Sequence, residues 1–235
     1  MNHTMLNHID QTLTLWLNGS HSLYVDGIAW ASTQTITWIP IMLVLIYVIV
    51  RNNSLSGMAT VILSIGLCIL LADQVASTIC KPLVARFRPT NDPFITYSVD
   101  VVNAYRGGKY GFFSSHAANT TAVATFLSLL FRHRPLIWWL YSWSLLNCWT
   151  RVYLGVHYVG DLLTGILWGL CVGYGIYKLC QRYSEPLAQR RDQFGHRTGF
   201  TSSGYNIATL RLLAGVLLLS YLAIAFYALF TNLIR

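Results

Sequence analysis

The residues whose side chains could most readily take part in catalysis lie in one short stretch, 148–161, which contains Arg151, His157 and Asp161. His157 and Asp161 are four residues apart, so on a helix they share a face and the carboxylate can hold the imidazole in one tautomer. A histidine held in this way can act as a nucleophile or as a general base. A structural role fits the same residues, with Arg151 extending to water and the His–Asp pair capping a helix. The stretch alone leaves both interpretations open, because perturbed ionisable groups also occur in structural ion pairs.

A second group of polar residues precedes this stretch. Lys81 and Arg88 begin a polar segment rich in proline and glycine, and Ser114, Ser115 and His116 end it. Lysine and arginine together neutralise a phosphate, and arginine adds a bidentate fork. Serines at a helix start offer hydroxyls and free backbone N–H groups to an anion. Two histidines would supply one nucleophile and one proton donor, and because there are too few carboxylates for a two-metal phosphatase, we predict phosphoryl transfer without a metal.

The composition indicates what kind of scaffold must position these groups. Of the 235 residues, 54% are hydrophobic and only 10% are charged, whereas soluble domains carry about 25% charged residues. We therefore expect an all-α integral membrane protein, and we use the net charge of +8 to predict topology and not a nucleic-acid partner. The five cysteines are expected to be buried, inert thiols, because their number is odd and their spacing suggests neither a disulfide framework nor a zinc site.

The apolar segments predict a bundle of six transmembrane helices forming one domain over residues 1–235. An N-terminal amphipathic helix within residues 1–20 is expected to lie in the membrane interface, because its apolar residues fall at helical spacing on one side. The predicted spans are about 25–50, 57–80, 115–131, 136–154, 161–181 and 207–233.

The charges of the connecting segments predict the orientation. Arginine and lysine gather in the segments around 51, 132–134 and 178–197, with few acidic residues, so this side should be cytoplasmic. The unusual polar groups all fall on the other side. We expect a multi-pass protein of the cell inner (cytoplasmic) membrane, with its site facing the periplasm or the exterior.

The order and spacing of these groups resemble the three signature motifs of the type-2 phosphatidic acid phosphatase superfamily, in its bacterial branch of membrane lipid phosphate phosphatases. The first motif is Lys81, six residues, then Arg88-Pro89; the third is Arg151, five residues, His157, three residues, Asp161. The middle motif usually reads Pro-Ser-Gly-His, but here it reads Phe-Ser-Ser-His over 113–116, and the third begins with Thr instead of Ser. A serine in the glycine position needs a backbone angle that a side chain tolerates.

The resemblance implies a role for each matching residue. His157 would be the nucleophile that forms a phosphohistidine, Asp161 would orient it, and His116 would protonate the leaving oxygen and then activate water. The family uses neither a metal nor another cofactor.

The remaining matching residues would bind the phosphate. The resemblance assigns this role to Lys81, Arg88, Arg151 and Ser114, with Ser115 contributing at least a backbone N–H.

The expected function is hydrolysis of a membrane lipid phosphate: a polyprenyl pyrophosphate, a phosphatidate or phosphatidylglycerophosphate, or lipid A phosphate. Three alternatives stay open at this point: a phosphotransferase that passes the phosphoryl group to another lipid, a non-enzymatic transporter or receptor for a phosphorylated ligand, and vanadate-dependent peroxidase chemistry. The expected partners are the lipid substrate and the bilayer. The oligomeric state is left open, with a monomer favoured.

Three further features need an interpretation. Asp73 could balance Lys81 or Arg151, or make a structural contact between helices. Arg86, close to Arg88, is interpreted as a surface or head-group contact in preference to a catalytic residue. The segment 90–112 is a candidate lid or interfacial belt, and the glycines at 165, 169 and 173 favour close helix packing within the chain.

Overall fold

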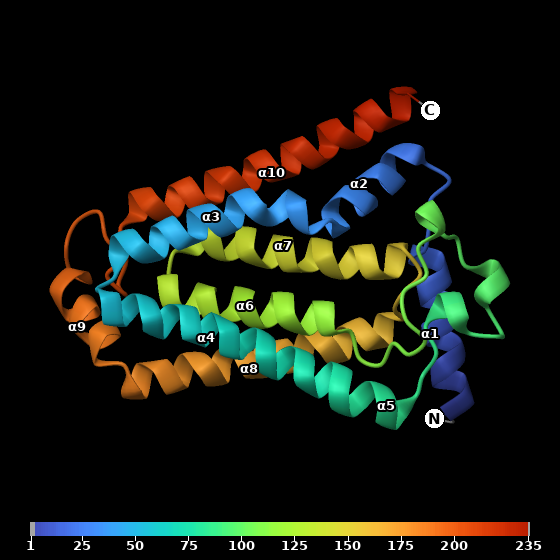
Figure 1. The fold of residues 1–235 in the computed structure, drawn as a ribbon, viewed down its shortest axis with the longest axis horizontal. Helices are drawn as coiled ribbons and strands as arrows, with labels where there is room; N and C mark the ends of the chain where they lie inside the picture. The colour runs from blue at the N-terminus through green and yellow to red at the C-terminus, as the bar shows by residue number, and fades with distance from the viewer. Residues whose placement is uncertain (1–2, 235) are drawn as a thin grey trace.

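The computed structural model describes residues 3–234, and long helices running side by side dominate it (Figure 1). The long helices are α3 (Thr35–Asn52), α4 (Leu55–Gln74), α6 (Ser115–Phe131), α7 (Arg134–Tyr153), α8 (Val159–Tyr183) and α10 (Ile207–Ile234). The shorter ones are α1 (His3–Leu17), α2 (Leu23–Thr33), α5 (Lys81–Val84) and α9 (Glu185–Phe194). A π-helix, η1 (Val75–Cys80), joins α4 to α5, and the 3-10 turns η2 (Pro89–Asn91), η3 (Thr96–Ser98) and η4 (Val102–Ala104) follow.

Helix α6 forms the centre of the bundle, and α8 approaches it closely through three small residues, Gly165, Gly169 and Gly173. A Cβ added at Gly169 would lie 2.5 Å from the carbonyl oxygen of Ala118, and one at Gly173 would lie 2.4 Å from that of Ala122. Only glycine permits this backbone separation, so the expectation that these glycines pack within the chain is confirmed. The packing fixes the start of α8 next to the start of α6.

The predicted span 25–50 is not one continuous helix, because the chain is extended at Gln34 and separates α2 from α3. The break frees carbonyl groups at the end of α2, and side chains of α3 satisfy them. Thr37 Oγ1 donates to the carbonyl of Ala31 at 2.7 Å, and Trp38 Nε1 donates to that of Ser32 at 2.9 Å. Irregular backbone at membrane depth is tolerated where protein groups satisfy it in this way.

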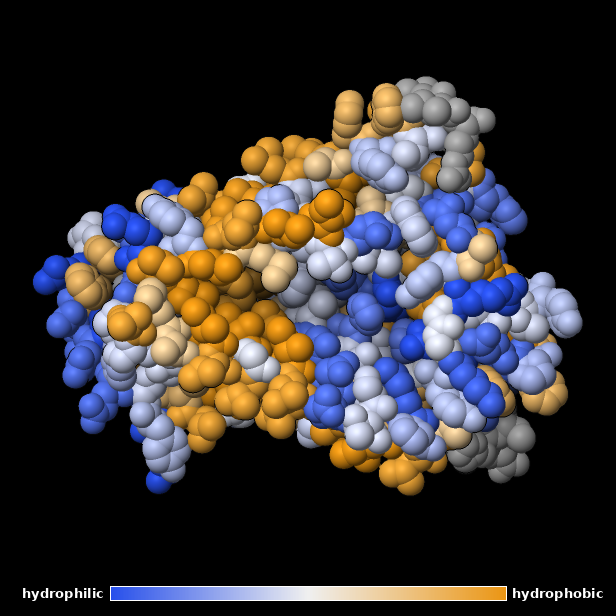
Figure 2. Space-filling view, viewed as in Figure 1, coloured by the Kyte–Doolittle hydropathy of each residue, from blue (hydrophilic) through white to orange (hydrophobic). Residues whose placement is uncertain are grey.

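Within the described residues, four helical stretches are long and apolar enough to cross a membrane: Thr35–Asn52, Leu55–Val84, Val159–Tyr183 and Ile207–Thr231. The chain is therefore a multi-pass membrane protein. Figure 2 shows hydrophobic residues gathered over the middle of the molecule, with hydrophilic ones at the α9 end and over much of the opposite end. Helices α6 and α7 do not reach this standard of length and composition. Most of α6 is buried against other helices, so its side chains do not have to dissolve in lipid.

The predicted hydrophilic loop 182–205 contains a helix, α9, which is anchored to the bundle by Arg190. The Arg190 guanidinium stacks 3.4 Å from the ring centroid of Tyr205, and its Nη2 donates to Asn53 Oδ1 at 3.1 Å. This anchor lies at one end of the bundle, and the candidate site lies at the other.

Candidate active site

The predicted site residues come from four separate segments that meet at the end of the bundle opposite α9 (Figure 1). Four charged or titratable groups act electrostatically on His116: Lys81, Arg88, Arg151 and His157. His116 itself is exposed. The structure therefore brings the two histidines and the three cations of the predicted site together.

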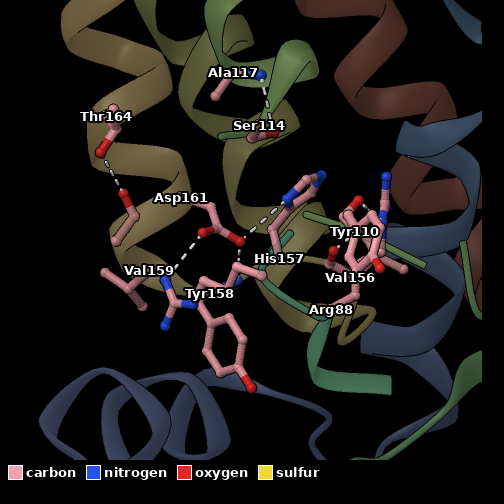
Figure 3. Close-up of polar contacts among 12 residues, drawn as sticks. Arg88, Tyr110, Ser114, Ala117, Val156, His157, Tyr158, Val159, Asp161 and Thr164 are labelled. Carbon is pink, nitrogen blue, oxygen red and sulfur yellow. Dashed lines mark hydrogen bonds and ion pairs between the residues drawn. The ribbon is translucent and has the colours of Figure 1, made fainter. Parts of the chain in front are cut away.

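His157 and Asp161 lie at the junction between α7 and α8, and both are fully buried, with 1% and 0% of their surfaces exposed. His157 Nδ1 is 3.4 Å from Asp161 Oδ2 (Figure 3), which is an ion-pair distance longer than that of an ordinary hydrogen bond. Asp161 Oδ2 also accepts from the backbone N–H of Tyr158 at 3.0 Å. The carboxylate thus faces Nδ1 and leaves Nε2 of the imidazole available for chemistry.

Burial controls the protonation state of His157. It lowers the pKa of the imidazole to about 4, although the Asp161 carboxylate acts in the opposite direction and favours the protonated form. The ring is therefore neutral near pH 7, which is the state that a nucleophilic nitrogen requires.

Lys81 is the first residue after the π-helix η1, and a short hydrogen-bonded chain holds its ammonium group. Nζ donates to Ser77 Oγ at 3.1 Å and to Ser115 Oγ at 3.2 Å, and Ser77 Oγ donates to Asp73 Oδ1 at 3.2 Å. Asp73 is thus connected to Lys81 through Ser77. π-Helices are often found at functional sites, and here η1 directly precedes Lys81.

Arg88 is held by backbone carbonyl groups. Its Nε donates to the carbonyl of Tyr110 at 3.1 Å, and its Nη1 donates to that of Val156 at 3.3 Å. Gly111 packs beside it: an added Cβ would lie 3.1 Å from Arg88 Cγ and 3.1 Å from Asp161 Oδ2. This end of segment 90–112, whose role the sequence left open, is therefore part of the wall of the site.

Arg151 is the most enclosed of the three cations, with 2% of its surface exposed. Its Nε donates to Thr150 Oγ1 at 3.2 Å, and Nη2 makes a short contact to Thr33 Oγ1 at the end of α2. Thr150 replaces the usual serine of the third motif, and its hydroxyl is the group that Arg151 contacts.

Ser114 and Ser115 take different positions at the start of α6. Ser114 is the N-cap, and its Oγ accepts from the N–H of Ala117 at 3.3 Å. Ser115 is the first residue of α6, and its φ is not positive. A serine therefore fits the position where the family has glycine without backbone strain.

The interpretation of Arg86 as a surface or head-group contact is wrong. Arg86 Nη1 lies 3.0 Å from Asp161 Oδ1, and Nη2 lies 2.7 Å from Asp10 Oδ2 on α1. The guanidinium also sits 3.9 Å from the ring centroid of Tyr158. The sequence carried a weak signal for this: a third basic residue lies beside the first motif, and an isolated aspartate lies on the polar side of α1. The sequence carried no signal for Gly111, because only the folded chain places it beside Asp161.

Comparison with known proteins supports a family assignment. A family model described as "PAP2 superfamily" matches residues 57–185. A lipid A 4'-phosphatase of Bacteroides thetaiotaomicron is 36% identical over 217 residues, which are 92% of this chain and 96% of that protein. A lipid A 4'-phosphatase of Porphyromonas gingivalis is 35% identical over 172 residues, covering 73% and 72% of the two chains.

A solved structure supports the same fold. The transmembrane PAP2-type phosphatidylglycerolphosphate phosphatase from Bacillus subtilis aligns with a TM-score of 0.55 at 18% identity, over 77% of this chain and 89% of that one. The predicted resemblance and the prediction of a phosphatase are both confirmed. The chain belongs to the PAP2 superfamily, and it is a membrane phosphatase.

Proposed function

We propose that this protein hydrolyses the 4'-phosphate of lipid A at the outward face of the cell inner membrane. The observation that supports this choice of substrate is the 36% identity to a lipid A 4'-phosphatase over 92% of this chain and 96% of that protein. The match includes nearly the whole chain, so it extends beyond the motifs that the superfamily shares. Among the substrates that the sequence left open, this one has a specific observation in its favour.

In the first step, His157 Nε2 attacks the phosphorus and the bond between phosphorus and the lipid oxygen breaks. The imidazolium form of His116 donates a proton to that oxygen and becomes neutral, and the products are the dephosphorylated lipid and a phosphohistidine at position 157. The Asp161 carboxylate accepts a hydrogen bond from Nδ1–H of His157, and the proton stays on the ring. The carboxylate stabilises the positive charge that develops on the imidazole. The phosphoryl oxygens are neutralised by Lys81, Arg88 and Arg151.

In the second step, His116 removes a proton from water, and the water oxygen attacks the phosphohistidine. The bond between phosphorus and Nε2 breaks, inorganic phosphate leaves, and His157 returns to its neutral form. Ser115 supports this step by holding the Lys81 ammonium at 3.2 Å. Ser114 contributes by capping α6, so that the first N–H groups of that helix face the anion.

The proposed placement in the membrane follows from the ends of the bundle. Helices α6 and α7 would cross with the four apolar stretches, which gives six spans. Helix α1 would lie on the outward surface, because it exposes Met5, Leu6, Ile9, Leu13 and Trp16. The arginine-rich end with α9 would be cytoplasmic.

The test is phosphate release from purified protein supplied with single lipids and EDTA. The panel contains lipid A with only the 4'-phosphate, lipid A with only the 1-phosphate, a polyprenyl pyrophosphate and a phosphatidate. We expect the 4'-monophosphate to have the highest kcat/KM and His157→Ala to abolish release. Preference for another lipid would overturn the proposed substrate assignment. Full activity of His157→Ala would overturn the proposed mechanism. Transfer of the phosphoryl group to a second lipid, with no free phosphate, would identify a phosphotransferase.

A further inference from the structure

We propose that Asp10 and Arg86 are positioning residues, through which helix α1 holds the Asp161 carboxylate in its working orientation. The inference rests on the proposed function, because it concerns the reaction in which Asp161 orients His157. The inference is argued from three charged side chains that contact one another in sequence. They are Asp10 on α1, Arg86 within the first motif, and Asp161 near the start of α8.

Arg86 bridges the two carboxylates with separate nitrogens. Nη1 is 3.0 Å from Asp161 Oδ1 and Nη2 is 2.7 Å from Asp10 Oδ2. The side chains are mostly removed from water, with 23% of Arg86, 16% of Asp10 and 0% of Asp161 exposed. Solvent screens such pairs poorly, and removal of one partner leaves a buried charge uncompensated. The ring of Tyr158 packs against the guanidinium, with the ring centroid 3.9 Å from Arg86 Cζ.

Asp10 also binds the backbone of the helix that carries Asp161. Its Oδ1 accepts from the N–H of Gly160 at 2.9 Å, and Thr14 Oγ1 accepts from the N–H of Val159 at 3.1 Å. The first N–H groups of a helix have no partner within that helix. Helix α1 therefore caps α8 from a distant part of the chain, and the same carboxylate that caps α8 fixes Arg86.

This arrangement assigns the two oxygens of Asp161 to different partners. Arg86 occupies Oδ1, so Oδ2 is left to face His157 Nδ1 at 3.4 Å. Without the cation, the carboxylate would be free to rotate or to take up a proton, and His157 would lose its preferred tautomer. Neither Asp10 nor Arg86 is assigned to the phosphate, so we expect the loss to appear in kcat and not in KM.

The experiment compares full-length variants on the best substrate of the lipid panel. The test variants are Asp10→Asn, Arg86→Gln and Arg86→Lys. The matched controls are Asp192→Asn and Arg191→Gln, which remove the same charges from an exposed pair 3.2 Å apart with 68% and 52% of the side chains exposed. We expect kcat to fall about 10- to 100-fold in Asp10→Asn and Arg86→Gln, with KM within about twofold of wild type. Arg86→Lys should recover part of the loss, because it keeps a cation beside Asp161, and both controls should match wild type.

The outcomes separate this inference from the proposed function. A wild-type protein that releases no phosphate from any lipid would overturn the proposed function and the inference with it. If wild type is active, His157→Ala is inactive and Asp10→Asn equals wild type, the positioning role alone is overturned. Melting temperatures provide the second measurement: a loss of activity that follows a loss of folded protein, with KM rising and no recovery in Arg86→Lys, would indicate a merely structural pair and also overturn it.

Discussion

At the scale of single residues, the protonation state of His157 is the property on which the chemistry depends. Burial lowers the pKa of His157 to about 4, below the ordinary value of about 6.5, so we expect a neutral ring at pH 5 and at pH 7. Nitrogen-15 spectra of the imidazole groups in detergent would show this, with His157→Gln identifying the signal. An imidazolium pattern for His157 at pH 6 would contradict the account.

A second prediction at this scale concerns Gly111. Alanine there would place its Cβ 3.1 Å from Arg88 Cγ and from Asp161 Oδ2, so these side chains must move, and we expect kcat/KM to fall about tenfold. The matched control is Gly108→Ala in the same segment, where an added Cβ meets no described atom within 4 Å. Equal activities of the two variants would show that Gly111 does not shape the site.

The residues of the site were predictable from the sequence only where a motif contained them. His157 and Asp161 are four residues apart in the third motif, but they do not share a helix face: His157 precedes α8, and Asp161 turns back toward it by accepting from the N–H of Tyr158 at 3.0 Å. Arg86 and Asp10 are separated by 76 residues, and no periodic pattern connects positions that far apart. The ion pair between them depends on where α1 docks, which only the tertiary structure determines.

At the scale of elements, the contact between α6 and α8 sets the distance between His116 and the His157–Asp161 pair. A Cβ at position 169 would lie 2.5 Å from the carbonyl oxygen of Ala118, so Gly169→Ala should destabilise the protein by about 1–3 kcal/mol through overpacking. Gly175→Ala on the same helix is the control, because its added Cβ meets no described atom within 4 Å, and it should be neutral or stabilising. Thermal unfolding in detergent measures both. A Gly169→Ala protein as stable as wild type would refute the close packing.

The hydrophobic pattern predicted the long helices but not the interruptions within them. Helix α6 covers Ser115–Phe131 as expected, whereas the break at Gln34 and the π-helix η1 were not predicted. Both interruptions lie inside the predicted spans 25–50 and 57–80, beside serines and threonines that do not by themselves end a helix. They are stabilised by contacts that the sequence does not display, such as Trp38 Nε1 donating to the carbonyl of Ser32 at 2.9 Å.

At the scale of the whole molecule, the account places the two ends of the bundle on opposite sides of the membrane. A cysteine added at position 97, where Tyr97 is 98% exposed, or at position 192 on α9 can report this. A membrane-impermeant maleimide added to spheroplasts should label Tyr97→Cys above the background of the unsubstituted chain. Asp192→Cys should react only after the membrane is opened, and the reverse pattern would contradict the orientation.

The most direct test of the central claim is whether His157 carries the phosphoryl group during turnover. Lipid A bearing a labelled 4'-phosphate would be mixed rapidly with wild-type protein and quenched in alkali, in which phosphohistidine is stable, and labelled peptides would be identified. We predict that the label appears on the peptide containing His157 and decays as inorganic phosphate is released, and that the His157→Ala chain acquires no label and releases no phosphate. Phosphate release by the His157→Ala chain at the wild-type rate, or turnover by wild type with no label on His157, would contradict the account.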